Sequence, residues 1–201
     1  MLLQKSLLYI CLLLGLPATA GPQWHLIKEG HGIKVYTAAP GPGAYKSIKA
    51  EAVFTGTVEK FRALLLDIAR QPQWVYGTRH AHLVKKVNNQ ELLYYVETAL
   101  PWPADNRDAL IRMRLKENKA LHALTVTSVG EPQALPVQDS KVRVPHFDAR
   151  WEVKPAGKDK ISLTYLLDID PGGSLPAWIT NLFISKGPYE TFRNLSDQLK
   201  K

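Results

Sequence analysis

The sequence has 201 residues, of which 45% are hydrophobic, a formal net charge of +8 and one cysteine. This length suits a single domain with a substantial core, and one cysteine excludes an intramolecular disulfide. No run of Lys and Arg exceeds two residues, whereas nucleic-acid binders concentrate charge on one face, so we expect no nucleic-acid partner. The excess charge favours either weak attraction to anionic lipid head groups or a well-solvated surface.

The first twenty residues are typical of a secretory signal peptide. Lys5 precedes an almost wholly apolar run over residues 7–16, and an Ala-Thr-Ala cleavage site ends at Ala20. Because a membrane-spanning helix needs about 20 apolar residues, an uncleaved anchor is the weaker alternative. We expect cleavage after Ala20, which leaves residues 21–201 as one domain and removes the cysteine. An exported domain without cysteine suggests a periplasmic or secreted protein.

Hydrophobic periodicity predicts the elements of the amino-terminal third. We expect a short helix or lead-in over 24–29, then strands over 33–36 and 45–54, separated by a turn rich in Pro and Gly. Thr57 is expected to cap a helix that runs to about Asp67, because the apolar residues that follow it fall at helical spacing.

Strands dominate the middle of the chain. We predict them over residues 81–87, 92–100, 109–116, 121–129, 141–144, 147–153 and 161–169. Around Pro145 the apolar residues switch from even to odd positions. A β-bulge would explain this switch, because one extra residue reverses the face that each side chain occupies.

A long helix is predicted at the carboxy terminus. Ser174 is expected to cap it, Pro176 lies in its first turn, and Gly187-Pro188 should kink it. The expected fold class is therefore α+β, with a curved antiparallel sheet, a middle helix and a terminal helix that covers the apolar face of the sheet. Tight packing of that cover would leave only a core, whereas a cover that stands off would leave a pocket.

Four stretches resemble the START domain, the lipid-transfer domain related to steroidogenic acute regulatory protein. They are "GIKVY" at 32–36, "YKSIKAEAVF" at 45–54, "NRDAL" at 106–110 and "DIDPGGSLPAWITNLF" at 168–183. With the spacing between them, the resemblance covers nearly all of residues 24–199. One departure is Asn106, which stands where the family's Pro-Arg-Asp sequence has proline.

The resemblance implies a helix-grip fold with an internal tunnel that holds one lipid or other hydrophobic molecule. It also implies a buried acid–base pair in the tunnel, which by position would be Glu97 and Arg112. The alternation of the strand leaves a second orientation open, because Ile111 and Met113 form its apolar face and would turn Arg112 outward. Arg112 would then belong to an ordinary surface ion pair.

The resulting hypothesis is a non-enzymatic carrier, expected to be a monomer without cofactor or metal, that exchanges its ligand during transient contact with a membrane. The residues expected to bind the ligand are Glu97, Arg112, Tyr95, Tyr165, Trp178, Ile179, Leu182, Phe183 and Tyr189. The main alternative is a cyclase or hydrolase for a hydrophobic substrate, with Glu97 and a tyrosine or histidine as acid and base. A ligand-sensing module is a third possibility.

His80 and His82 place two imidazoles on one face of a predicted strand, an arrangement that occurs in some metal sites. No third ligand is identifiable nearby in the sequence, so a surface role is favoured for both.

Overall fold

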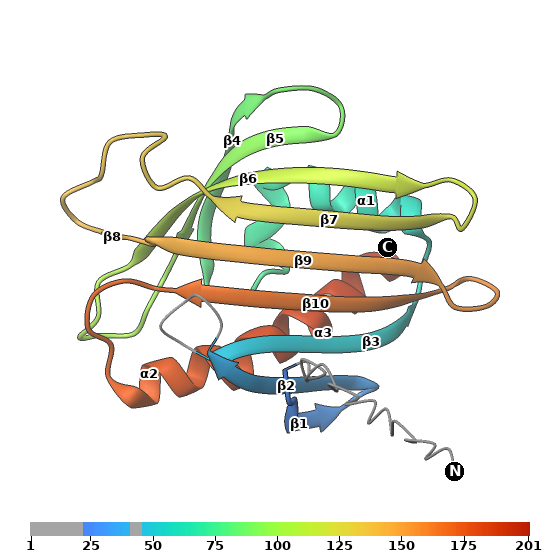
Figure 1. The fold of residues 1–201 in the computed structure, drawn as a ribbon, viewed down its shortest axis with the longest axis horizontal. Helices are drawn as coiled ribbons and strands as arrows, with labels where there is room; N and C mark the ends of the chain where they lie inside the picture. The colour runs from blue at the N-terminus through green and yellow to red at the C-terminus, as the bar shows by residue number, and fades with distance from the viewer. Residues whose placement is uncertain (1–21, 41–45) are drawn as a thin grey trace, which may run out of the picture.

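The computed structural model describes residues 22–40 and 46–201, and within them ten strands form one curved, largely antiparallel sheet (Figure 1). The strands are β1 (His25–Gly30), β2 (Ile33–Pro40), β3 (Lys46–Thr55), β4 (Thr78–Lys86), β5 (Glu91–Thr98), β6 (Arg107–Asn118), β7 (Ala123–Gly130), β8 (Val142–Arg143), β9 (His146–Pro155) and β10 (Lys160–Asp170). Their order across the sheet is β1-β2-β3-β10-β9-β7-β6-β5-β4, and the short β8 pairs in parallel with β6. The predicted signal peptide lies outside the described residues.

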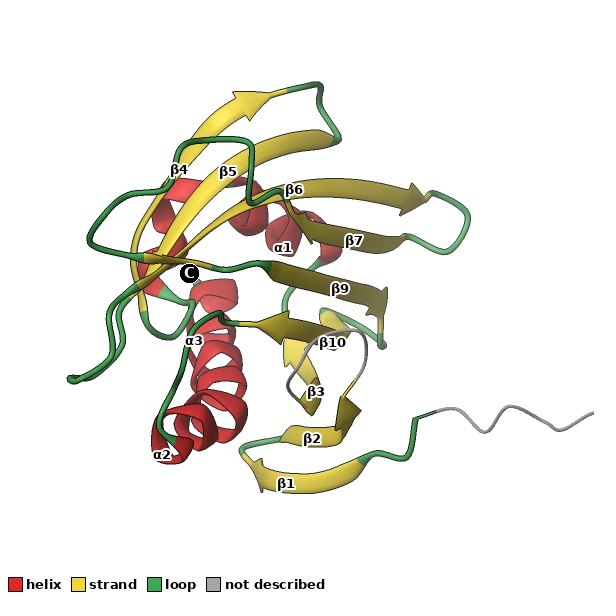
Figure 2. Ribbon diagram, turned by 60° about the vertical axis from the view of Figure 1, so that its left-hand side comes forward, coloured by secondary structure: helices red, strands yellow, loops and turns green. Residues whose placement is uncertain are grey.

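The helical segments lie on the concave side of the sheet. They are α1 (Val58–Leu66), the 3-10 helix η1 (Ile68–Gln73), α2 (Ala177–Asn181), the π-helical segment η2 (Leu182–Lys186) and α3 (Gly187–Lys200). Figure 2 shows α3 running inside the curve of the sheet, with α2 continuing from one of its ends. This arrangement is the α+β helix-grip fold that the sequence predicted.

Local sequence explains why α1 begins where it does. The Thr57 hydroxyl accepts a hydrogen bond from the backbone N–H of Lys60 at 3.2 Å, as the predicted cap requires. Phe61, Leu64 and Leu65 are its buried residues, spaced so that one face of the helix meets the sheet. The helix ends at Leu66, within one residue of its expected end.

The core lies between the helices and one face of the sheet. On β10 the inner face carries the odd-numbered residues, of which Ile161 and Leu163 are 1% and 0% exposed. Ala50 of β3 and Val153 of β9, also fully buried, lie on the same face. The ring centroid of Phe192 on α3 lies 6.1 Å from that of Phe54 and 5.5 Å from that of Trp151, so α3 is anchored by aromatic contacts.

Three sequence predictions are wrong in detail. Residues 25–30 form strand β1 rather than a helix, because they pair with β2 along the edge of the sheet. The phase switch near Pro145 is not a bulge, because β8 pairs with β6 while β9 lies between β7 and β10. The terminal helix begins at Ala177, and its first turn follows Pro176 without a side-chain cap from Ser174.

Candidate ligand pocket

A pocket lies between the inner face of the sheet and the carboxy-terminal helix. Its larger part, the main pocket, has a volume of about 210 Å³ and is lined by residues of α1, η1, the following loop, β4–β7, β9, β10, η2 and α3. Its smaller part, the side pocket, has a volume of about 150 Å³ and lies toward α2. The two parts share four wall residues: Thr98, Leu167, Ile169 and Phe183.

The pocket opens because the helix fills the space beside only part of β10. Tyr165, Leu167 and Ile169 continue the inner face of Ile161 and Leu163, yet they are only partly buried and line the pocket. The terminal helix contributes Phe183, Gly187, Pro188 and Thr191 to the wall of the main pocket. Apart from Phe183, these residues are small and leave the space beside β10 unfilled.

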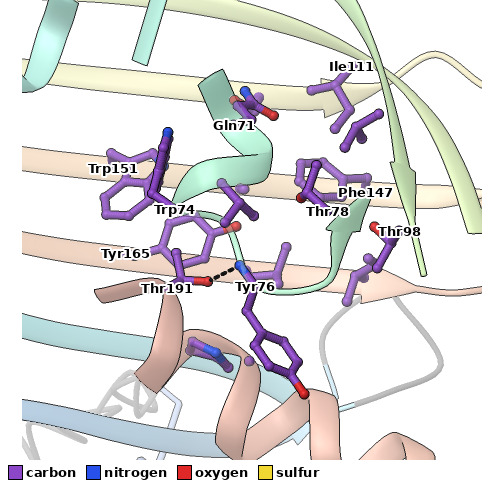
Figure 3. A pocket seen from close by; sticks show the side chains of 18 of the residues that line it. Gln71, Trp74, Tyr76, Thr78, Thr98, Ile111, Phe147, Trp151, Tyr165 and Thr191 are labelled. Carbon is purple, nitrogen blue, oxygen red and sulfur yellow. Dashed lines mark hydrogen bonds between the residues drawn. The ribbon is translucent and has the colours of Figure 1, made fainter. Parts of the chain in front are cut away.

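The helix is irregular beside the pocket. Pro188 has no N–H to donate to the carbonyl of Ile184, and the turn before it, η2, is π-helical. This break was predicted as a kink. Beyond this break, Thr191 of α3 accepts a hydrogen bond from the backbone N–H of Tyr76, in the loop between η1 and β4, at 3.0 Å (Figure 3). The ring of Tyr76 also meets that of Phe183 edge to face at 5.7 Å, so the helix and the η1–β4 loop are held together.

The described lining of the main pocket is apolar or uncharged. Its polar side chains are Gln71, Trp74, Tyr76, Thr78, Tyr94, Thr98, Ser128, Trp151, Tyr165 and Thr191. Burial raises the pKa of Tyr94 to about 12, and burial together with the nearby Tyr94 raises the pKa of Tyr165. Both phenols therefore remain protonated at any physiological pH and can donate hydrogen bonds.

The side pocket carries the positive charges, from Lys46 and Arg107. Arg107 donates hydrogen bonds to the carbonyls of Pro171 and Gly172 at 3.1 and 2.8 Å. Gly172 has φ +70°, a conformation that favours glycine. Arg107 thus stabilises the turn that precedes α2, and this is a structural role for the arginine of the "NRDAL" stretch.

The structure distributes the predicted helix residues over several environments. Phe183 lines both parts of the pocket. Trp178 is 53% exposed, Ile179 is 0% exposed, and Leu182 is partly buried. Tyr189 is buried and its hydroxyl bonds His31 Nδ1 at 2.8 Å. These four residues lie outside the pocket lining that the described residues form.

The predicted pair of Glu97 and Arg112 is wrong. Arg112 forms ion pairs with Glu131 and with Glu91, the latter at 2.9 Å, and these carboxylates raise its pKa. Its Cα partner on β5 is Leu93, whereas that of Glu97 is Asp108, so the two residues are well separated along the ladder. The alternation of β6 had indicated the correct outward orientation, because Ile111 and Met113 line the pocket.

Glu97 and Tyr95 also lie on the outer side of the sheet. Glu97 accepts a hydrogen bond from Asn106 at 2.7 Å and pairs with Lys141 at 3.2 Å. Burial raises its pKa, but these two partners outweigh burial, and the pKa of Glu97 is lowered overall. Tyr95 stacks on His82 with ring centroids 4.9 Å apart. Of the residues predicted from the sheet, Tyr165 is the one that lines the pocket.

Sequence reasoning missed Gln71, Trp74 and Tyr94 as wall residues. The sequence analysis named Tyr95 in place of Tyr94, because residues 92–96 are apolar on both faces of the strand and do not show which face is the inner one. Glu97 was the available signal, since an acidic side chain two residues after Tyr95 marks that face as the outer one. Gln71 and Trp74 lie on and just after η1, which the pattern did not predict.

Metal and membrane-spanning features are limited in the described residues. His80 and His82 place two ring nitrogens 3.2 Å apart, but no group of three His, Cys, Asp or Glu residues that could hold a metal is found there. Among the helices of residues 22–40 and 46–201, none has the length and apolar character needed to cross a bilayer.

The architecture defines the class: a helix-grip protein with a hydrophobic pocket under its carboxy-terminal helix. The START domain family model matches residues 6–201, and the chain belongs to this family. It is 28% identical over 184 residues to phosphatidylcholine transfer protein from Bos taurus, across 88% of this chain and 84% of that protein. It is also 26% identical over 178 residues to an uncharacterized protein from Pseudomonas aeruginosa, across 89% and 87%.

Solved structures agree with this assignment. A STAR-related lipid transfer protein from Xanthomonas axonopodis superposes with a TM-score of 0.80 at 28% identity, covering 89% of this chain and 99% of that one. Human StAR-related lipid transfer protein 5 superposes with a TM-score of 0.76 at 17% identity, covering 92% and 88%, which shows a shared fold.

Proposed function

We propose that this protein binds one lipid or other hydrophobic molecule in the pocket under its carboxy-terminal helix and carries it between membranes. The single observation behind the proposal is the pocket wall itself, where Tyr165, Leu167 and Ile169 face a space that protein side chains do not fill. The phosphatidylcholine transfer proteins and the STAR-related lipid transfer protein among the relatives support it.

Differential burial supplies the mechanism. Apolar ligand surface gains about 25 cal/mol per Å² when it leaves water for the pocket. It gains almost nothing when it leaves a bilayer, so uptake and release at a membrane are nearly balanced. A carrier of this kind needs a dry pocket and a means of opening it, but no reacting groups.

Native mass spectrometry of the purified mature protein, followed by organic extraction, tests the carrier function directly. We expect one bound hydrophobic molecule per chain. A protein that remains empty after exposure to vesicles, and leaves their lipid unaltered, would refute ligand binding.

We further propose that the protein meets the membrane with the end of the molecule that carries α2. Trp102, in the β5–β6 loop, is 88% exposed, and Trp178, on α2, is 53% exposed. Both segments lie at the same end of the sheet, beside the turn that links β10 to α2 (Figure 1). Tryptophan is suited to the membrane interface, and Lys46 and Lys186 at this end can attract anionic head groups.

A transfer assay between donor and acceptor vesicles tests this surface. Replacing both tryptophans with alanine should slow transfer at least tenfold and leave the ligand content of the purified protein unchanged. Leu121, 65% exposed in the β6–β7 loop at the opposite end, gives the matched control, and Leu121→Ala should transfer normally. Equal slowing by the control variant would contradict the proposed surface.

The carrier is preferred to the cyclase or hydrolase alternative. Glu97, the acid proposed for an enzyme, lies on the outer side of the sheet with Asn106 and Lys141 rather than at the pocket. The described pocket wall offers phenols, hydroxyls and an amide, which suit binding.

The sequence also motivates a proposal on location. We propose that residues 1–20 direct export and are removed after Ala20, so that the domain works in a periplasm or outside the cell. Mass measurement of the protein from its native host tests this, with an amino terminus at Gly21 expected and an intact leader as the contradicting result.

A further inference from the structure

One donor in the main pocket has no acceptor. Trp74 is 2% exposed and lines the main pocket, and its indole Nε1 is buried without a hydrogen-bond partner. An indole nitrogen can only donate. Burying such a donor without an acceptor costs free energy, and in native proteins an unpaired buried polar group often has a functional role.

We propose that Trp74 Nε1 donates a hydrogen bond to an uncharged oxygen of the bound ligand. The preferred ligands would then be amphiphiles that place a hydroxyl, carbonyl or ester oxygen inside the main pocket. This inference rests on the proposed carrier function and assigns the chemistry of the ligand group that the pocket recognises.

The position of Trp74 is fixed by its surroundings. Its backbone N–H donates to the carbonyl of Gln71 at 3.0 Å, and its own carbonyl accepts from Asn194 Nδ2 of α3 at 3.4 Å. The backbone of Tyr76, two residues later, is held by Thr191 of the same helix. Figure 3 shows Trp74 among the labelled side chains that line the main pocket. The donor is therefore held in place before a ligand arrives.

The surroundings of Trp74 also require the oxygen to be uncharged. Gln71, Tyr94 and Tyr165 provide only neutral partners, and the described main-pocket wall contains no Lys, Arg, His, Asp or Glu. A charged head group there would lose its hydration without gaining a counter-ion. The positive groups, Lys46 and Arg107, belong to the side pocket beyond the shared wall.

Two probes that differ by one oxygen test the inference. Affinities for 1-dodecanol and dodecane are measured by displacement of bound pyrene from wild-type protein and from Trp74→Phe, which keeps an aromatic ring but removes the donor. We expect the substitution to weaken dodecanol binding about tenfold more than dodecane binding, a coupling of about 1.4 kcal/mol. Comparing the probes across the same substitution cancels their different solubilities.

The matched control is Trp151→Phe, which removes the same atoms from another indole of the same wall. It should affect the two probes equally. Equal losses for both probes in Trp74→Phe, or a dodecanol-selective loss in the control, would overturn the inference while leaving the carrier function intact. If neither pyrene nor the two probes bind to the wild-type protein, the carrier function itself fails, and the inference with it.

A measurement on the unsubstituted protein guards against misfolding of the variants. In an ¹H–¹⁵N spectrum of protein labelled at the indole nitrogens, dodecanol should move the Trp74 N–H resonance downfield relative to dodecane, as a new hydrogen bond requires. Identical Trp74 positions with the two probes bound would contradict the proposed contact.

Discussion

The carboxy-terminal helix meets the same sheet in two different ways. At its final turns, the packed end, Phe192 and Leu195 are 0% exposed and Leu199 is 2% exposed. At its beginning, the open end, Phe183 and Ile184 are only partly buried and line the pocket. Strand β10 shows the same division, because its inner residues are fully buried near Ile161 and partly exposed near Ile169.

The difference between these ends comes from the size and regularity of the helix residues. The packed end is a regular α-helix that presents large side chains to the core. The open end is π-helical and is followed by Gly187 and Pro188, which present little volume to the sheet. A pocket therefore arises from a local reduction in packing on one continuous element, without a separate lid domain.

The largest expected effect is at the packed end. Phe192→Ala should destabilise the protein by about 3–5 kcal/mol, since it leaves a cavity among Phe54 and Trp151. Phe183→Ala, the matched change at the open end, should cost about 1 kcal/mol or less, because its ring is already partly exposed. Denaturant unfolding measures both.

Ligand binding should respond in the opposite way. Phe183 lines both parts of the pocket, so its removal should enlarge the space that they share and change which probes bind. Phe192→Ala, studied where it remains folded, should bind as the wild type does. Similar stability losses for the two substitutions would show that the ends do not differ as described.

Most of the fold could be predicted from the sequence because sheet and helix periods are strong signals. The inner residues of β10, from Ile161 to Ile169, alternate without interruption and gave their face correctly. Failures occurred where tertiary pairing decides the outcome. Residues of β1 form a strand because they pair with the edge strand β2. The pairing of β8 with β6 joins residues far apart in the sequence, so the local pattern does not predict it.

The site was less predictable, because a pocket forms where side chains fail to fill the space between elements, and this depends on the tertiary structure. Tyr165 and Phe183 were found from their positions on apolar faces. Trp178 was expected to bind the ligand from the same terminal helix, yet it is 53% exposed and lies outside the pocket lining. Arg112 was placed correctly by alternation and wrongly by position in the family, so the local physical signal was the better one.

A smaller effect is expected from a change on the outer side of the sheet, away from the pocket wall. Glu97→Gln should cost about 1–2 kcal/mol at neutral pH, because it removes the negative partner of Lys141. Ligand binding should remain unchanged, since Glu97 lies outside the pocket. Loss of turnover on a hydrophobic substrate in this variant would instead support an enzyme.

The same variant has a defined dependence on pH. The folded protein lowers the pKa of Glu97, so its contribution to stability is complete above the unfolded value of about 4.3 and is lost as the pH falls through the folded value. Urea unfolding between pH 7 and pH 3 should therefore show a smaller stability difference between wild type and variant in acid. A difference that stays constant over this range would contradict the lowered pKa.

The smallest effect comes from adding one methyl group to the open end. The side chain of Gly187→Ala would meet Tyr76 at 3.7 Å and Phe183 at 4.0 Å, which are ordinary contacts. Alanine favours the helix, so stability should rise by about 0.5–1 kcal/mol.

The methyl group also occupies pocket volume, so affinity for pyrene should fall even as stability rises. Ser196→Ala, on the same helix outside the pocket lining, is the control and should leave affinity unchanged. Opposite signs for stability and binding at Gly187 are what an underpacked, ligand-sized space requires. If the affinity instead rises with stability, Gly187 contributes flexibility and the space beside it is not where the ligand sits.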